Sequence, residues 1–436
     1  MTAHRFAVGG TGPRHRFVIG AFSVHMLQMV EKQGEEEEVV AVEGGAYHLL
    51  TEPAERREAV LRQIDSARRS LRLAFYIFAE DKIGNAVRDA LLAALGRGVE
   101  VAMIIDGFGS AATPDAFFQP LIDAGARMYR FHPRYGRRYL FRNHQKMVVA
   151  DEARALVGGF NIADDYFAAP EDHGWCDLGL ELKGPVAGEL AGWFDALQNW
   201  SRMPRARMSL LARMIRRHSD SAGAARLLLT GPMRRMSPMT RALRADLGTV
   251  GRLDMVAAYF SPNYGMLRRL GRIPRRGGTA RIIGAALSDN NATVAAWRHC
   301  LHRLLVRGVE VREYEVTKLH MKLVVTDDVV WLGSANFDMR SLYLNLELML
   351  RIEDGTLAKQ ARALVDRLAD QSRLITRQLH EARSVWWRRL RWMIAYYMVA
   401  TLDPAVSAGL FRLENDETMQ RRSRFRPRRA AQSESR

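Results

Sequence analysis

Two short stretches of the chain share a pattern of side chains that can do chemistry on a phosphate. The stretches read HQKMVVAD and HMKLVVTD, and they contribute His144, Lys146 and Asp151, and His320, Lys322 and Asp327. A neutral histidine can attack phosphorus, and a protonated histidine can deliver a proton to a leaving alkoxide. Two such triplets in one chain therefore predict a single site in which one histidine is the nucleophile and the other the acid.

Each stretch is followed by a glycine-led turn that ends in asparagine, GGFN at 158–161 and GSAN at 333–336. The glycines allow close approach of the backbone, and we expect Asn161, Ser334 and Asn336 to bind phosphate oxygens. The two lysines would offset the charge that develops on the non-bridging oxygens. These residues form a complete set for phosphoryl transfer that requires no metal and no cofactor. Two copies of H-x-K-x4-D, each with G-[GS]-x-N behind it, are hard to obtain by chance.

The spacing also predicts how the histidines are held. Side chains alternate along a strand, so each histidine projects to the same face as the lysine two positions later. A nucleophilic histidine needs an acceptor at its other ring nitrogen, to fix the tautomer. Asp177 and Glu347 lie at matching places after the two asparagines, and we expect them to orient His144 and His320. The aspartates of the triplets lie an odd number of positions away, so we expect them to be structural and to pair with backbone or a basic group.

Both triplets lie within an internal repeat. The repeat pairs 39–44 with 227–232, 71–78 with 252–260, 97–106 with 280–286, and 125–133 with 307–316. Strands that alternate with helical patterns favour an α/β fold. Continuous apolar runs such as MVVA and LVVT indicate strands that are buried on both faces. The predicted organisation is a poorly patterned, disordered extension at 1–38, a first half at 39–200, a basic linker or insert at 201–222, a second half at 223–375, and a basic, Trp-rich segment at 376–436.

Composition narrows the class of protein. The chain has 436 residues, 48% of them hydrophobic, and a net charge of +17. The excess arginines cluster at 202–217, 383–391 and 421–429. Such clusters favour a polyanionic partner, either nucleic acid or an anionic bilayer. Two cysteines imply no disulfide framework and fit a reducing compartment. No run of about 18 apolar residues occurs, so the sequence predicts no membrane-spanning helix.

The motifs resemble those of the phospholipase D superfamily and, within it, of the bacterial cardiolipin synthases, over about residues 39–370. The string GSANFDMRSLYLNLE is the most specific to that subfamily, and YIFAED at 76–81 and WCDLGLELKGP at 175–185 occupy comparable places. The resemblance implies two pseudo-twofold-related α/β/α halves that share one active site, and a phosphatidyl-histidine intermediate. It also implies catalytic roles for both triplets. The residues alone leave open which histidine attacks, and the resemblance favours His144 as nucleophile and His320 as acid.

The resemblance implies transfer of a phosphatidyl group to phosphatidylglycerol, with release of glycerol, and an anionic phospholipid membrane as partner. Many such synthases begin with two transmembrane helices, and this chain resembles shorter forms that lack them. We therefore expect peripheral binding to the cytoplasmic face of the cell membrane. The segment 384–400 combines tryptophans, tyrosines and arginines in a way that suits a bilayer interface, although a helix packed on the core would have a similar composition.

Three other functions remain open at this point. A phospholipase D would transfer the same group to water and release phosphatidic acid. A nuclease of the superfamily would fit the basic patches, although superfamily nucleases of the simplest kind carry one motif and dimerise. The basic segments also lie beside Trp and Met without forming a base-stacking array, so we expect no nucleic acid partner. A membrane-binding scaffold without activity is disfavoured because both motifs are intact.

Overall fold

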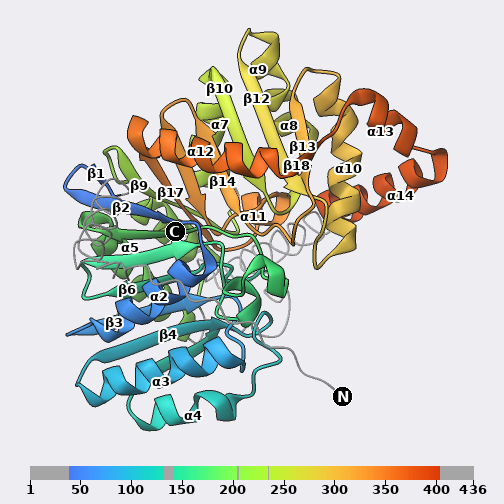
Figure 1. Ribbon diagram of the computed structural model, residues 1–436. Helices are drawn as coiled ribbons and strands as arrows, with labels where there is room; N and C mark the ends of the chain where they lie inside the picture. The colour runs from blue at the N-terminus through green and yellow to red at the C-terminus, as the bar shows by residue number, and fades with distance from the viewer. Residues whose placement is uncertain (1–38, 132–140, 204–205, 234, 403–436) are drawn as a thin grey trace, which may run out of the picture. The chain divides into compact units, whose positions relative to one another are not determined.

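The computed structural model describes residues 39–131, 141–203, 206–233 and 235–402. The predicted extension at 1–38 and the basic end at 403–436 lie outside the described residues. The described part contains two eight-stranded sheets of mixed direction with helices packed against them (Figure 1). This arrangement confirms the predicted α/β class.

The first sheet has the strand order β1-β2-β8-β7-β6-β3-β4-β5. Its strands are β1 (Val40–Val42), β2 (Gly45–Leu50), β3 (Ser70–Phe75), β4 (Glu100–Asp106), β5 (Arg127–Phe131), β6 (Met147–Ala150), β7 (Arg154–Gly158) and β8 (Gly179–Lys183). The accompanying helices are α2 (Pro53–Asp65), α3 (Lys82–Gly96), α4 (Asp115–Asp123), the short η2 (Asp164–Tyr166) and η3 (Pro170–Asp172), α5 (Pro185–Arg202) and α6 (Met208–His218).

The second sheet has the order β18-β13-β12-β10-β14-β15-β17-β9. Its strands are β9 (Ala225–Thr230), β10 (Arg252–Ala257), β12 (Thr279–Ala285), β13 (Glu310–Tyr314), β14 (Lys322–Thr326), β15 (Val329–Gly333), β17 (Glu347–Glu353) and β18 (Ser372–Leu374); β11 (Phe260–Ser261) and β16 (Phe337–Asp338) form a separate ladder. The helices are α7 (Pro238–Thr249), α8 (Tyr264–Leu270), α9 (Arg272–Arg275), α10 (Asn291–Leu305), α11 (Met339–Tyr343), α12 (Gly355–Asp370), α13 (Arg377–Arg383), α14 (Trp386–Tyr397) and η4 (Met398–Leu402).

Seven strands follow the same order in both sheets. The order β2-β8-β7-β6-β3-β4-β5 corresponds to β9-β17-β15-β14-β10-β12-β13, with β6 and β14 carrying the two motifs. The strand β12 therefore matches β4, and β13 matches β5, as the sequence predicted for 280–286 and 307–316. Both motif strands are buried along their whole length, as expected for central strands covered on two faces.

One strand assignment was wrong. The prediction paired 39–44 with 227–232, but β1 is an added edge strand and β2 occupies the place that matches β9. The chain reverses between β1 and β2 at Glu43 and Gly44, which both have positive φ, 46° and 74°. A short edge hairpin of this kind depends on turn conformation, and the apolar pattern of 39–44 does not reveal it.

A shared core joins the two halves. One apolar cluster contains Trp193 and Leu197 of α5 together with Leu227 of β9 and Leu348 of β17. The helix α6, which lies within the predicted linker at 201–222, buries Leu211 and Ile215 in the same cluster. This part of the segment is therefore packed structure, and burial of its apolar face stabilises the junction between the sheets.

Candidate active site

Both motif histidines lie in extended segments just before the motif strands, and each segment is held by the opposite half. The backbone N–H of His144 donates to the carbonyl of Leu346, and that of His320 donates to the carbonyl of Cys176, at 2.9 and 2.7 Å. Parallel bridges between Asn143 and Leu346, and between Cys176 and Leu319, extend the two contacts. Each histidine is thereby fixed against the residue that precedes a carboxylate of the other half.

The two predicted carboxylates contact the two histidines crosswise. His144 Nδ1 lies 2.9 Å from Glu347 Oε2, and His320 Nδ1 lies 2.6 Å from Asp177 Oδ2. Both carboxylates are fully buried. The sequence predicted the four residues but left open which carboxylate serves which histidine. The crosswise arrangement means that neither half holds its own histidine without the other.

The carboxylates determine which ring nitrogen is reactive. A carboxylate at Nδ1 accepts the proton that this nitrogen carries, which leaves a lone pair at Nε2. Burial lowers the pKa of both imidazoles, that of His320 to about 4, so both rings are neutral near pH 7. Burial also opposes ionisation of Asp177 and Glu347, but the facing histidines and lysines outweigh it and keep both carboxyl pKa values below their ordinary range.

The two lysines are buried and act on both histidines. Lys146 Nζ donates to the carbonyl of His144 at 2.6 Å, and Lys322 Nζ lies 3.0 Å from His320 Nε2. Burial lowers the pKa of both lysines, that of Lys322 to about 8. The charge of Lys322 also lowers the pKa of His144, and that of Lys146 lowers the pKa of His320. The cations of both motifs therefore act in one electrostatic environment.

The aspartates of the triplets lie away from the histidines and bind backbone. Asp151 accepts from the backbone N–H groups of Arg68, Arg69 and Ser70 at 2.7 to 3.2 Å. Asp327 accepts from those of Gly251 and Arg252 at 2.8 to 3.2 Å. Both aspartates have positive φ, 56° and 48°, at the turn that follows each motif strand. They tie that turn to the start of the neighbouring strand, so their geometry is structural.

The three predicted phosphate-binding residues differ in their surroundings. The amide of Asn161 is engaged on both sides, because Oδ1 accepts from the N–H of Ile77 and Nδ2 donates to the Tyr166 hydroxyl. The hydroxyl of Ser334 donates to Glu347 Oε2 at 2.6 Å. Asn336 is buried, and its Oδ1 has no hydrogen-bond partner among the described residues. Ser334 thus supports a carboxylate, and Asn336 Oδ1 keeps its capacity to accept a hydrogen bond.

Aromatic rings that the sequence did not single out surround the histidines. The ring centre of Tyr76 lies 4.9 Å from that of His144. Those of Tyr166 and Trp175 lie 5.1 and 5.4 Å from that of His320. Tyr76 and Trp175 begin the two strings YIFAED and WCDLGLELKGP, and the resemblance of these strings to the family was the sequence signal that could have identified the two residues. Which histidine each ring contacts is set by the tertiary structure.

Neither a metal cluster nor a spanning helix occurs in the described part of the chain. Residues 39–131, 141–203, 206–233 and 235–402 contain no group of three or more His, Cys, Asp or Glu placed to hold a metal ion. None of the helices in these ranges is both long and apolar enough to cross a bilayer.

Solved structures share this fold. Phosphatidylserine synthase from Haemophilus influenzae aligns over 90% of this chain and 98% of its own, with a TM-score of 0.62 and 14% sequence identity. Polyphosphate kinase from Porphyromonas gingivalis aligns over 76% of this chain and 49% of its own, with a TM-score of 0.52 and 16% identity. At these identities the likeness shows the fold.

Sequence comparison goes further. The family described as cardiolipin synthase, PLD-like domain, matches residues 60–197 and 248–369, more than half of the chain. Cardiolipin synthase 2 from Bacillus cereus is 30% identical over 346 residues, 77% of this chain and 66% of that protein. Cardiolipin synthase A from Pseudomonas putida is 30% identical over 326 residues, 73% of this chain and 67% of that protein. The chain thus spans about two thirds of the length of these relatives, and it belongs to the cardiolipin synthase family with a phospholipase D-like domain.

Proposed function

We propose that this chain is a phosphatidyltransferase that joins two molecules of phosphatidylglycerol and releases glycerol. The two relatives named above that are 30% identical to this chain are cardiolipin synthases, and both catalytic motifs are complete in this chain. The observation that carries the proposal is the crosswise pairing of each histidine Nδ1 with a buried carboxylate of the other half. That pairing keeps Nε2 of each ring outside the carboxylate contact and available for chemistry on a phosphodiester, and at His320 this nitrogen also lies 3.0 Å from Lys322 Nζ.

In the first step, His144 Nε2 attacks the phosphorus of the donor lipid. A P–N bond forms, and the bond between phosphorus and the headgroup oxygen breaks. The protonated imidazole of His320 gives its Nε2 proton to the departing glycerol oxygen. The products of this step are a phosphatidyl-histidine at residue 144, free glycerol and a neutral His320.

In the second step, a hydroxyl of the acceptor phosphatidylglycerol gives its proton to His320 and attacks the phosphorus. The P–N bond breaks, His144 returns to its neutral form, and the new phosphodiester is cardiolipin. Glu347 and Asp177 stabilise the positive charge that each ring carries in turn. Lys146 and Lys322 offset charge on the non-bridging oxygens.

The lowered pKa values of the free site fit this scheme. A neutral His144 is ready to attack near pH 7. His320 must be protonated to act as acid, and a bound phosphodiester anion favours that form because it adds a negative charge beside the ring. Substrate binding therefore raises the pKa of His320 from its value of about 4 in the free protein.

The test is product analysis with phosphatidylglycerol vesicles. We expect cardiolipin and glycerol from the wild-type protein, and a loss of at least about 10³-fold in His144→Ala and His320→Ala. His173→Asn is the control, because His173 is exposed and has a φ of 63°, which asparagine tolerates. Phosphatidic acid as the sole lipid product would replace the synthase assignment with hydrolysis. Undiminished activity in both alanine variants would refute the site.

A further inference from the structure

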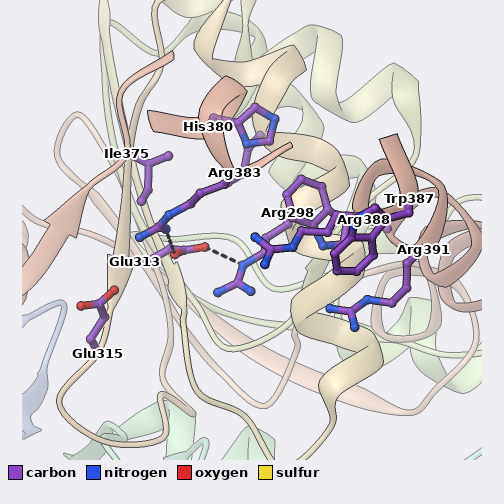
Figure 2. A pocket seen from close by; sticks show the side chains of 11 residues that line it. Arg298, Glu313, Glu315, Ile375, His380, Arg383, Trp387, Arg388 and Arg391 are labelled. Carbon is purple, nitrogen blue, oxygen red and sulfur yellow. Dashed lines mark hydrogen bonds and ion pairs between the residues drawn. The ribbon is translucent and has the colours of Figure 1, made fainter. Parts of the chain in front are cut away.

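A cavity of about 370 Å³ lies apart from the paired histidines, where α13 and α14 pack beside α10 and β13 (Figure 2). Four arginines line it, from three different helices: Arg298, Arg383, Arg388 and Arg391. Trp387 and Trp392 contribute aromatic surface to the same wall. The cavity thus combines guanidinium groups with large rings, a combination suited to an amphipathic anion.

The arginines are only partly neutralised. The buried carboxylate of Glu313 is bridged by Arg298 at 3.1 Å and by Arg383 at 3.4 Å. Arg388 and Arg391 form no ion pair with any carboxylate in the part of the chain that the structure describes. The guanidinium of Arg388 instead lies 5.1 Å from the ring centre of Trp387. Two exposed guanidiniums therefore line the cavity without a carboxylate partner. Guanidinium is the side-chain group best matched to phosphate.

The helix α14 has two apolar faces, and only one of them is covered. Trp392 and Tyr396 pack toward α10, and the Tyr396 hydroxyl donates to the carbonyl of Pro262 at 2.8 Å. On the other side, Trp386, Leu390, Met393 and Tyr397 recur every three or four residues and are exposed, Trp386 at 77%. Trp387, Ile394 and Met398 are exposed beside them. A stripe of this size on a helix that is already docked marks a binding surface.

We propose that the cavity binds the phosphate of an anionic phospholipid, while the exposed stripe of α14 enters the same bilayer. Charge complementarity favours a membrane, because unneutralised arginines adjoin exposed tryptophan, tyrosine and aliphatic side chains on a single helix. The membrane-binding helix α14 is connected to the candidate active site. The segment η4 that follows it lies against α11, and α11 begins three residues after Asn336. The proposal rests on the proposed function only in its choice of phosphatidylglycerol as the lipid.

The test measures binding of the full chain to vesicles by flotation. Wild-type protein should bind vesicles that contain phosphatidylglycerol far more tightly than vesicles of phosphatidylcholine alone. Arg388→Ala combined with Arg391→Ala should weaken binding by roughly 30-fold, the loss expected for two basic residues at an anionic surface. Both side chains are exposed, so the fold should persist. Trp386→Ser combined with Ile394→Ser should weaken binding to the same vesicles by removing apolar contact.

The matched control is Arg216→Ala combined with Arg217→Ala, which removes the same charge from exposed positions on α6. Equal losses in the two arginine pairs would overturn the proposal, because binding would then follow net charge alone. If Trp386→Ser combined with Ile394→Ser changed the mass of the protein in light scattering and left vesicle binding unchanged, the proposal would also be overturned. The stripe would then be a contact between copies of the chain. Competition by inorganic phosphate as strong as that by phosphatidylglycerol vesicles would assign the cavity to free phosphate and overturn it as well.

Turnover separates this proposal from the proposed function. His144→Ala should lose turnover of short-chain phosphatidylglycerol below its micellar concentration and should still bind phosphatidylglycerol vesicles as the wild type does, because His144 lies outside the residues that line the cavity. Lack of turnover by the wild type under these conditions would count against the proposed function and leave the vesicle result intact. Loss of vesicle binding in His144→Ala would overturn the docking role, since binding would then depend on the reaction site and not on the cavity and α14.

Discussion

At the scale of single residues, the two halves hold their carboxylates differently. Glu347 reaches Ser334 and His144 with the same oxygen. In the first half the position that matches Ser334 is Gly159, and the shorter Asp177 fills the space beside it. A Cβ built on Gly159 would lie 2.2 Å from Asp177 Oδ1. The difference between GGFN and GSAN thus reflects a difference in the carboxylate that each turn supports.

This geometry predicts that Gly159→Ala displaces Asp177 and impairs the reaction. Asp177 is fully buried and bound to both His320 and the backbone N–H of Leu178, so it cannot move away without losing a partner. We expect a loss of about 1–3 kcal/mol in the free energy of unfolding, the usual cost of overpacking, and a drop in kcat of at least about 10-fold. Urea unfolding and steady-state kinetics measure the two effects.

The control for this change is Gly96→Ala in the same half. A Cβ on Gly96 meets no atom within 4 Å, and this residue ends α3. Stability and kcat should then stay close to those of the wild type. If Gly159→Ala also behaved as wild type, Asp177 would have to be free to shift, and its proposed part in orienting His320 would fail.

The sequence predicted the members of the site better than their contacts. His144, His320, Asp177 and Glu347 could be chosen because spacing and residue type repeat. The crosswise pairing could not be chosen, because it depends on how the two sheets meet, and no local pattern encodes that. The same holds for Tyr166 and Trp175, whose rings reach His320 from the other half.

At the scale of elements, α14 packs on the protein and also exposes an apolar face, so its packing does not rule out either of the two alternatives that the sequence presented. The composition of 384–400 fitted either an interfacial helix or a helix packed on the core. In the structure α14 packs through Trp392 and Tyr396 and still exposes a second apolar face. When apolar residues occur around most of a helix, the sequence does not reveal which face packs against the rest of the chain. For α14 this depends on the position of α10.

The packing of α13 predicts a pH dependence of stability centred on His380. Its ring stacks on Trp392 with centres 5.7 Å apart. Burial and the nearby His302 and Arg389 lower the pKa of His380 to about 4, against the opposing charge of Glu381. In the unfolded chain a histidine titrates near pH 6.5. Between these values the unfolded chain binds a proton that the folded chain does not, so stability present above pH 6.5 is lost as the pH falls toward 4.

Urea unfolding of the wild type and of His380→Phe, between pH 7 and pH 4, measures this effect. The wild type should lose on the order of 2 kcal/mol relative to the variant over that range, less than for an enclosed group because His380 borders the arginine-lined cavity. Phenylalanine keeps the stacking ring and cannot bind a proton. Parallel pH curves for the two proteins would show that His380 keeps its ordinary pKa.

At the scale of the whole molecule, the two sheets depend on one another. The fold class and the correspondences of β3, β4, β5 and β6 with β10, β12, β13 and β14 followed from the repeat, because buried strands have a strong apolar signature, whereas that of β2 with β9 did not. The way the halves join did not, since α6 and its buried Leu211 have no counterpart in the repeat. The shared cluster and the exchanged carboxylates make the junction part of both the core and the site.

This junction predicts that the two halves unfold together. Trp193 and Trp331 are fully buried, the first in helix α5 of the first half and the second in strand β15 of the second sheet. In protein labelled with 5-fluorotryptophan, their fluorine signals should lose native shifts at the same urea concentration. Leu211→Ala, in the shared core, should lower both midpoints together, at a cost of about 2–5 kcal/mol. The exposed Leu374→Ala should leave both unchanged. If one signal kept its native shift after the other was lost, each half would be an independent folding unit, and the crosswise contacts would contribute little to stability.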